Sequence, residues 1–148
     1  MIEFGIESTI NRPIEDVFER LIDIDSYPEW LPKSNIFISC RKVSKGPVGA
    51  GTEFVDETHF GTFQGVVEEF ERPTRVTFTN QLYWLGLKVL ESRPGYILEA
   101  TDAGTKVRHI AEAELYGLFR LLKPLIARMA MKERSRTVEQ LKKSLEST

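Results

Sequence analysis

Residues 118–145 read LFRLLKPLIARMAMKERSRTVEQLKKSL, and this is the most informative segment of the chain. Its apolar side chains recur with a period of about 3.6 residues, which is typical of an amphipathic helix. They are Leu118, Leu121, Leu122, Leu125, Ile126, Met129, Val138, Leu141 and Leu145. We expect a helix roughly 40–45 Å long, with a kink at Pro124 or a true start near Lys123 because proline is poorly tolerated inside a helix.

Most of the chain before this helix is predicted to form strands. Residues 2–10 alternate between apolar and polar side chains, which indicates a half-buried strand. Further extended segments are predicted at 36–44, 52–60, 62–71, 75–83, 95–102 and 105–115. Turn residues rich in glycine and proline separate them at 45–47, 60–62, 72–74, 93–95 and 102–104. Consecutive strands joined by short turns favour an antiparallel sheet.

Two short helices are predicted between the first and second strands. In the first, Val17, Phe18 and Leu21 follow at helical spacing. We expect Asn11 or Arg12 near its cap, Pro13 in its first turn and an end near residues 23–25. The second covers residues 26–32, where Pro32 is expected to stop it.

This order of elements predicts an α+β domain over residues 1–148. A curved antiparallel sheet of six to seven strands needs a cover for one face, and the last helix is the only large amphipathic element. We therefore predict a helix-grip fold, in which the sheet wraps around the long C-terminal helix. Such an arrangement tends to leave a cavity between helix and sheet where ligands bind.

Composition excludes several classes of protein. With 41% hydrophobic and 28% charged residues, the chain is neither disordered nor fibrous. No apolar run is long enough to span a bilayer, and the start MIEFGIEST lacks the basic region of a secretory signal. We expect a cytoplasmic protein.

The scarce residues exclude several kinds of site. One cysteine, Cys40, cannot form an internal disulfide or a cysteine-rich zinc site, and two histidines are too few for a three-histidine metal site. The glycine motifs of phosphate loops, dinucleotide sites and nucleophile elbows are absent from the sequence. We expect no metal and no cofactor.

The charge is unevenly distributed, although the net charge is only −2. Residues 117–148 hold eight Lys or Arg and three Glu, so the C-terminal segment is basic. A basic segment can bind nucleic acid or anionic lipid. We favour a solvated helix face docked on an acidic body, and expect no nucleic-acid partner.

Short motifs spread along the chain support a family resemblance. They are Ile10-Asn11-Arg12-Pro13 with Val17-Phe18, residues 23–30, Gly49-Ala50-Gly51-Thr52, residues 67–76, Gly104-Thr105-Lys106-Val107 and Leu141-Lys142-Lys143 with Glu146. In this order the chain resembles the START-like superfamily, also called Bet v 1-like or SRPBCC. Within it, the chain is similar to the polyketide cyclase/dehydrase and lipid transport family.

The resemblance implies a hydrophobic cavity for lipids, polyketides, isoprenoid quinones or steroids. It implies no shared catalytic set, because some members of the family are cyclases and others are carriers. Fold alone therefore does not establish catalysis here.

Strand register supplies two candidate catalytic residues. His109 shares a face with Val107 and Ala111, so we expect it to point inward, either toward a ligand or into a structural hydrogen bond. If Gly61-Thr62 is a two-residue turn, Phe54 and Asp56 also face inward. An acid–base pair of Asp56 and His109 follows as a hypothesis. A shift of one residue would replace Asp56 with Glu57 and His59.

The expected cavity is lined by apolar and aromatic side chains from several elements. The candidate ligand-binding residues are Trp30, Phe54, Phe63, Phe78, Tyr96, Leu98, His109, Leu125 and Met129. Trp30 is either core or a side chain at the mouth of the cavity. The cluster at residues 83–87 is expected to be a loop that either packs on the sheet edge or touches a membrane.

Three functions remain open from the sequence. The leading hypothesis is a protein that binds or carries a small hydrophobic ligand of lipid, polyketide, isoprenoid or quinone type. The second is an enzyme resembling a polyketide cyclase or dehydratase, with His109 and Asp56 or a tyrosine such as Tyr96. The third is a partner-binding module that acts through the last helix or residues 83–87. The ligand and the oligomeric state stay open.

Overall fold

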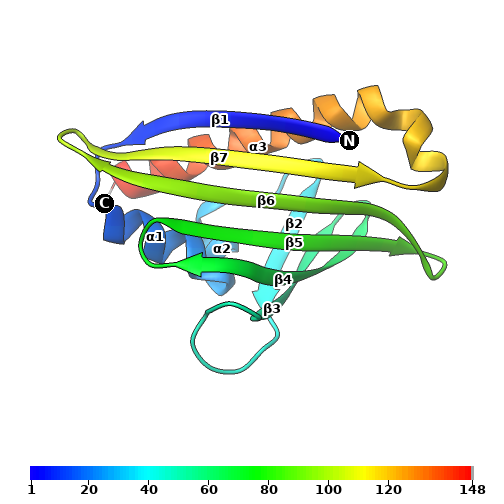
Figure 1. The fold of residues 1–148 in the computed structure, drawn as a ribbon, viewed down its shortest axis with the longest axis horizontal. Helices are drawn as coiled ribbons and strands as arrows, with labels where there is room; N and C mark the ends of the chain where they lie inside the picture. Colours follow the sequence, from blue (N-terminus) through cyan, green and yellow to red (C-terminus); the bar gives the residue numbers. More distant parts are fainter. Residues whose placement is uncertain (148) are drawn as a thin grey trace.

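A computed structural model describes residues 1–147, in which seven strands form one antiparallel sheet (Figure 1). Their bounds are β1 Ile2–Ile10, β2 Phe37–Lys42, β3 Glu53–Thr58, β4 Gly61–Glu71, β5 Arg75–Trp84, β6 Leu87–Thr101 and β7 Gly104–Leu115. Each of β2 to β6 pairs with the next strand in the sequence, and β1 pairs with β7 at the far edge.

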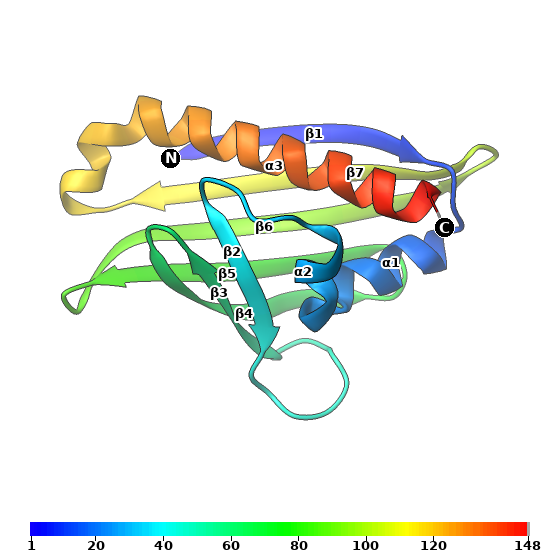
Figure 2. The same ribbon diagram turned by 180° about the vertical axis from the view of Figure 1, so that it is seen from behind.

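The helical elements lie between β1 and β2 and after β7. They are α1 Ile14–Ile22, a 3-10 helix Ile24–Ser26, α2 Tyr27–Trp30, a 3-10 helix Gly117–Leu122 and α3 Lys123–Glu146. Figures 1 and 2 show α3 running along the sheet, from the end where β7 finishes to the end where β1 finishes. The predicted curved sheet with a long C-terminal helix and two short helices is confirmed.

The long helix begins at Lys123, one of the two outcomes predicted for Pro124, which lies in its first turn. Its 24 residues span about 36 Å. It is shorter than predicted because residues 117–122 form a separate 3-10 helix. The apolar period continues through both elements, so the sequence pattern does not mark the boundary between them.

The predicted cap of the first helix is wrong in detail. Pro13 is the N-cap residue, with an extended backbone at φ −59° and ψ 149°, and Arg12 makes no cap. The Arg12 guanidinium instead pairs with Asp16 at 2.8 Å and donates a hydrogen bond to the Leu145 carbonyl at 2.6 Å. Arg12 thus fastens the start of α1 to the end of α3.

The turn predicted at residues 93–95 is wrong, because these residues lie inside β6. Pro94 pairs with Ala111 on β7, while the regular pairing with β5 is recorded only on either side of it, at Gly95 and Ser92. Proline cannot donate to a strand ladder, so it is tolerated where one side of the ladder is interrupted. A Cβ on Gly95 would lie 2.8 Å from Thr77 Cγ2, so this glycine serves close packing.

The loop predicted at residues 83–87 is also wrong. β5 continues to Trp84 and β6 begins at Leu87, so only Leu85 and Gly86 form the turn. Both have positive φ, 52° and 79°, which is typical of a tight hairpin turn of type I′. Alternation of apolar and polar side chains does not reveal the strand ends here, because the residues at 82–85 are apolar or aromatic on both faces of the strand.

The register predicted for the β3–β4 hairpin is shifted. Thr58 pairs with Gly61 and Asp56 with Phe63, so His59 and Phe60 form the turn. The Thr58 hydroxyl donates to the Gly61 carbonyl at 2.7 Å and accepts from the Phe60 amide, which fixes the turn two residues earlier than predicted. Phe63 therefore pairs with Asp56, four residues from the partner that the predicted turn would give it. Because side chains alternate along a strand, a shift by an even number of residues keeps the predicted inward face.

The hydrophobic core lies at the end of the sheet covered by α1 and the second half of α3. In α3 the buried residues are Thr137, Val138, Leu141 and Leu145, all in its C-terminal half. Its first half leaves space above the sheet, and the pocket lies there. Within residues 1–147, no helix is long and apolar enough to cross a membrane.

Candidate functional site

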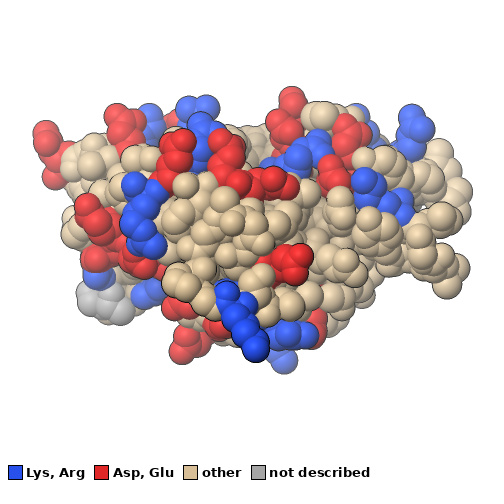
Figure 3. Space-filling view, turned by 60° about the horizontal axis from the view of Figure 1, so that its bottom comes forward, with Lys and Arg blue, Asp and Glu red and all other residues tan. Residues whose placement is uncertain are grey.

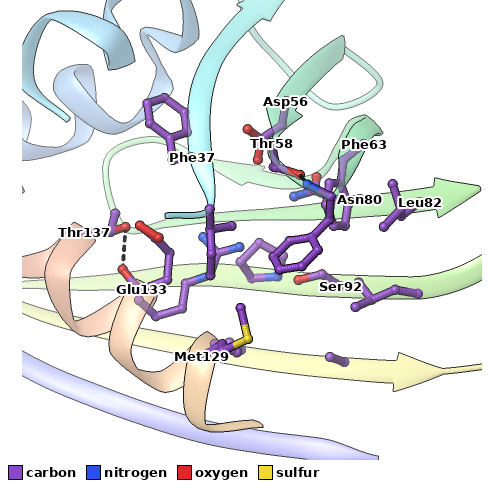
Figure 4. Close-up of a pocket in the computed structure, with 18 of the residues that line it drawn as sticks. Phe37, Asp56, Thr58, Phe63, Asn80, Leu82, Ser92, Met129, Glu133 and Thr137 are labelled. Carbon is purple, nitrogen blue, oxygen red and sulfur yellow. Dashed lines mark hydrogen bonds between the residues drawn. The ribbon is translucent and has the colours of Figure 1, made fainter. Parts of the chain in front are cut away.

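A pocket of about 320 Å³ opens between the concave face of the sheet and the first half of α3. This volume lies at the lower end of the range for small-molecule sites, roughly 300–1,000 Å³. Figure 4 shows that Asp56, Asn80 and Met129 reach the same space from β3, β5 and α3. The pocket is therefore built from segments far apart in the sequence.

Aromatic side chains form much of the wall. Phe54 and Phe78 meet edge to face, with ring centroids 5.6 Å apart. The tip of the Phe54 ring lies against Gly65, where a Cβ would come within 2.3 Å of Phe54 Cζ. The absence of a side chain at Gly65 thus sets the position of one wall of the pocket. Phe63 and Met129 complete this part of the lining.

Several of the polar side chains of the pocket are already engaged by the protein. Thr58 is used in the β3–β4 turn. Thr137 donates to the Glu133 carbonyl at 2.9 Å. The Glu133 carboxylate accepts from Ser34 at 2.7 Å and pairs with Arg136 at 2.9 Å. These groups therefore have less capacity for a ligand.

Three polar groups of the pocket stand apart from these. Asp56 Oδ1 and Asn80 Oδ1 are buried and have no hydrogen-bond partner among the described residues. Arg134 also lines the pocket, at a half-buried position of α3. Buried polar atoms are nearly always hydrogen-bonded in folded proteins, so unpartnered ones in a pocket indicate a place for ligand atoms.

Burial raises the pKa of Asp56 to about 7, against the opposing effect of the Arg134 guanidinium. Glu133 and Glu57 add to the rise because their negative charges disfavour a further carboxylate. Desolvation of the charged form is the physical cause. A carboxyl group with this pKa holds its proton part of the time at neutral pH, so it can either donate or accept a hydrogen bond.

The positive charge of Arg134 influences groups on several elements. Burial raises the pKa of Tyr27, Cys40 and Tyr96, that of Tyr96 to about 12, and Arg134 counteracts each rise. The three residues come from α2, β2 and β6. The Arg134 guanidinium therefore acts on titratable groups from three further elements of the fold.

His109 faces the concave side, as its strand register predicts, but it does not line the pocket. Its side chain has no exposed surface, and its Nδ1–H donates to the Gly95 carbonyl at 2.8 Å. Burial lowers its pKa to about 3, so the ring is neutral. The structure therefore does not bring His109 and Asp56 together as an acid–base pair in the pocket: only Asp56 lines it.

The predicted lining residues divide into two groups. Phe54, Phe63, Phe78, Tyr96, Leu125 and Met129 line the pocket. Trp30 and Leu98 belong to the hydrophobic core, and the Trp30 ring packs against Tyr27 with centroids 4.9 Å apart. These two residues and His109 do not line the pocket. The periodicity of a strand or helix predicts which face a side chain is on, but not how close to the pocket it lies along that face.

Sequence reasoning missed Arg134, although a signal was present. Val138, Leu141 and Leu145 follow it by four, seven and eleven residues, so Arg134 lies on the buried stripe of α3. A lone arginine on an apolar stripe is a candidate binding residue, because a buried charge requires a partner. Its charge groups it with the other basic residues of 117–148, and this grouping conceals its place on the apolar stripe.

The open end of the pocket carries exposed apolar side chains. Trp84 and Phe119 line the pocket and meet edge to face at 4.7 Å. Leu118 and Leu121 beside them are 80% and 78% exposed, and Leu85 and Leu87 are exposed as well. This end projects to the right in Figure 3, where uncharged surface lies beside Lys and Arg side chains.

Metal binding has no evident site in the described part of the chain. Among residues 1–147, no three His, Cys, Asp or Glu side chains lie together so that they could hold a metal ion.

Comparison with known proteins agrees with this geometry. The sequence model of the family described as polyketide cyclase / dehydrase and lipid transport matches residues 1–146. None of the curated proteins matches the chain.

Solved structures show the same fold at low identity. Ara h 8.0201 is 19% identical with a TM-score of 0.72, over 99% of this chain and 98% of its own. The di-domain ARO/CYC StfQ from the steffimycin biosynthetic pathway is 16% identical with a TM-score of 0.73, over 99% of this chain and 51% of its own. MLL2253 from Mesorhizobium loti is 18% identical with a TM-score of 0.71, over 99% and 98%.

Proposed function

Because the chain belongs to the polyketide cyclase/dehydrase and lipid transport family, we propose that it binds and carries a small hydrophobic molecule in the pocket between the sheet and α3. The observation that carries the proposal is an open pocket walled by aromatic and aliphatic side chains from the sheet and α3. Such concave apolar sites with a few polar groups are typical of small-molecule binding.

We assign ligand contact to Phe54, Phe63, Phe78, Leu125 and Met129. These side chains line the pocket from the sheet and from α3, so a ligand lies between the two layers. Met129 is unbranched and flexible, and it can adapt its shape to ligands of different outline. Tyr27 and Tyr96 also line the pocket, and each packs against a residue outside the lining: Trp30 against Tyr27 and His109 against Tyr96.

A pocket-filling substitution tests the proposal. Ala130 lines the pocket, whereas Ala127 lies on the same helix outside the lining. We expect Ala130→Phe to weaken binding of the neutral dye phenylnaphthylamine at least tenfold, and Ala127→Phe to leave it nearly unchanged. Circular dichroism checks that both variants fold. The proposal is wrong if the wild-type protein binds neither the dye nor any hydrophobic compound found by native mass spectrometry.

A catalytic role is the alternative, and the pKa of Asp56, raised to about 7 by burial, favours it. A carboxyl group with this pKa suits general acid–base catalysis near neutral pH. Since His109 does not line the pocket, catalysis of the cyclase or dehydratase type would depend on Asp56 with Arg134. Mass spectrometry of the ligand released after incubation distinguishes a carrier from an enzyme, because a carrier releases its ligand unchanged. If the protein is an enzyme, Asp56→Asn should abolish conversion of the ligand and leave its binding intact.

We further propose that the open end of the pocket contacts membranes transiently. Between Glu114 and Glu133 the chain holds no acidic residue, while Arg120, Lys123 and Arg128 are basic. Exposed leucines beside cationic side chains fit the interface of an anionic bilayer, because the leucines enter the acyl boundary and the cations meet the phosphates.

Vesicle flotation tests this contact. We expect wild-type protein to float with phosphatidylglycerol-containing vesicles and to be released by high salt. The double variant Leu118→Ser/Leu121→Ser should lose most of this binding. Val43→Ser is the control, because Val43 is an exposed apolar residue between β2 and β3. Failure of the wild type to bind anionic vesicles would contradict the membrane contact and leave ligand binding unaffected.

A further inference from the structure

Arg134 is the basic side chain in the pocket lining, and among residues 1–147 it has no ion-pair partner. Three other cations of α3 are paired: Arg136 with Glu133 at 2.9 Å, Lys142 with Glu146 at 3.5 Å and Lys143 with Glu139 at 3.0 Å. The remaining three, Lys123, Arg128 and Lys132, are exposed to solvent, whereas Arg134 is half-buried in the pocket lining. Within residues 1–147, no carboxylate lies within ion-pair distance of Arg134. Its guanidinium is thus available to an anion that enters the pocket.

Arg134 is half-buried in the pocket lining, so part of its charge is withdrawn from water. Burying a charge without a partner is strongly unfavourable, and an arginine fork matches a carboxylate with two parallel hydrogen bonds. Asp56 Oδ1 and Asn80 Oδ1 are buried, unpartnered and in the same pocket. The pocket therefore holds one cationic donor and two oxygen atoms, all without described hydrogen-bond partners.

We propose that the ligand is a hydrophobic carboxylic acid, whose carboxylate lies against Arg134 while its apolar body fills the aromatic part of the pocket. The proposal rests on the proposed function, since it names the class of ligand for the same pocket. Asp56 in its protonated form can donate a hydrogen bond to the bound carboxylate. Asn80 Oδ1 can accept one from a ligand hydroxyl.

A bound carboxylate and an ionised Asp56 would repel each other in the pocket. Binding is therefore coupled to proton uptake by Asp56, and affinity falls as the pH rises above 7. The charged or titratable groups whose fields interact with Asp56 are Arg134 and Glu133 of α3, Glu57 of β3, Cys40 of β2 and Tyr27 of α2. Burial raises the pKa of Cys40 and Tyr27, so neither changes charge near pH 7.

Titration calorimetry with decanoic acid and decanol tests the proposal, because the two probes differ only in the acidic group. We expect wild-type protein to prefer the acid at least tenfold at pH 6.5. Arg134→Met should remove this preference while keeping decanol affinity. Arg128→Met is the matched control, because Arg128 lies exposed on the same helix outside the pocket.

The pH series adds a readout that a structural role of Arg134 would not produce. From pH 6.5 to 8.5, affinity for decanoic acid should fall severalfold in the wild type, and Asp56→Asn should remove this fall. Binding of decanol and not of the acid would overturn the ligand class while leaving the proposed function intact. If neither probe nor the neutral dye binds, the proposed function itself fails.

Discussion

The imidazole of His109 stacks on the phenol ring of Tyr96, with ring centroids 4.2 Å apart and ring planes 15° apart. The two residues are direct partners across β6 and β7. Tyr96 lines the pocket, whereas His109 is fully buried. The histidine therefore supports the wall of the site through the tyrosine and does not form the wall itself.

Replacing His109 should change how stability depends on pH. Burial lowers its pKa in the folded protein to about 3 from the ordinary 6.5, so the unfolded chain binds the extra proton first. Its contribution to stability is present above pH 6.5 and is lost as the pH falls toward 3, by at most about 1.4 kcal/mol per pH unit. In His109→Gln, urea unfolding should show a weaker loss of stability toward acid than in the wild type.

Replacing Asp56 should have the opposite effect on the pH profile. Burial raises its pKa to about 7 from the ordinary 3.8, so its contribution to stability is present below pH 3.8 and is lost as the pH rises toward 7. Asp56→Asn removes the cost of the buried charge and should stabilise the protein at pH 8 by roughly 1–4 kcal/mol. Thermal unfolding at pH 8 and pH 4 measures the difference.

The two residues also predict a cancellation. Between pH 3.8 and 6.5 the folded chain holds a proton on Asp56, and the unfolded chain holds one on His109. Their slopes oppose each other, so each single variant should expose the slope of the other residue. If both variants keep the wild-type pH profile, the protonation states assigned to both groups are wrong.

The contact between Gly65 and Phe54 predicts a sensitive position. A Cβ at Gly65 would lie 2.3 Å from the Phe54 ring, which must then leave its place in the pocket wall. We expect Gly65→Ala to destabilise the protein by about 1–3 kcal/mol and to weaken ligand binding. Gly5→Ala is the control, because its Cβ would meet only the His109 carbonyl oxygen at 3.9 Å. Urea midpoints that are equal for the two variants would contradict the tight contact.

The two halves of the C-terminal segment should respond differently to truncation of leucine. Leu141 is fully buried in the core, and Leu141→Ala should cost about 2–5 kcal/mol of unfolding free energy. Leu121 is 78% exposed, so Leu121→Ala should change stability by less than about 0.5 kcal/mol. Comparable losses in chemical unfolding would mean that the first half is also packed in the core.

Most of the fold was predictable from local patterns. Alternation identified β1 and β7, and the even shift in the β3–β4 hairpin left Phe54 and Asp56 on the predicted face. Two errors fell on the β5–β6 pair: the turn at Leu85-Gly86 is shorter than the predicted loop, and Pro94-Gly95 lies inside β6. Proline and glycine usually mark turns, but a missing ladder hydrogen bond or a close packing contact gives the same signal inside a strand.

The candidate site was predictable only in part. Phe54, Phe63 and Phe78 line the pocket as predicted, because period two in a strand determines which side chains face inward. The period does not determine how far along the sheet a side chain lies from the pocket. His109 is on the predicted face, but it is fully buried outside the pocket lining, whereas Asp56 lies in the lining. Arg134 was missed because its charge placed it in a basic segment, although its spacing placed it on the buried stripe of α3.

The sequence by itself determined the order of the elements and the inward face of β3 and β7, because these follow from local periodicity. It limited the start of α3 to two outcomes at Pro124, because proline is poorly tolerated inside a helix. The tertiary structure alone decided where α3 meets the sheet, which half of it is core and which half covers a pocket. It also decided that Arg134 and Asp56 share that pocket. Such proximity depends on packing between residues that are distant in the chain, and no local pattern records it.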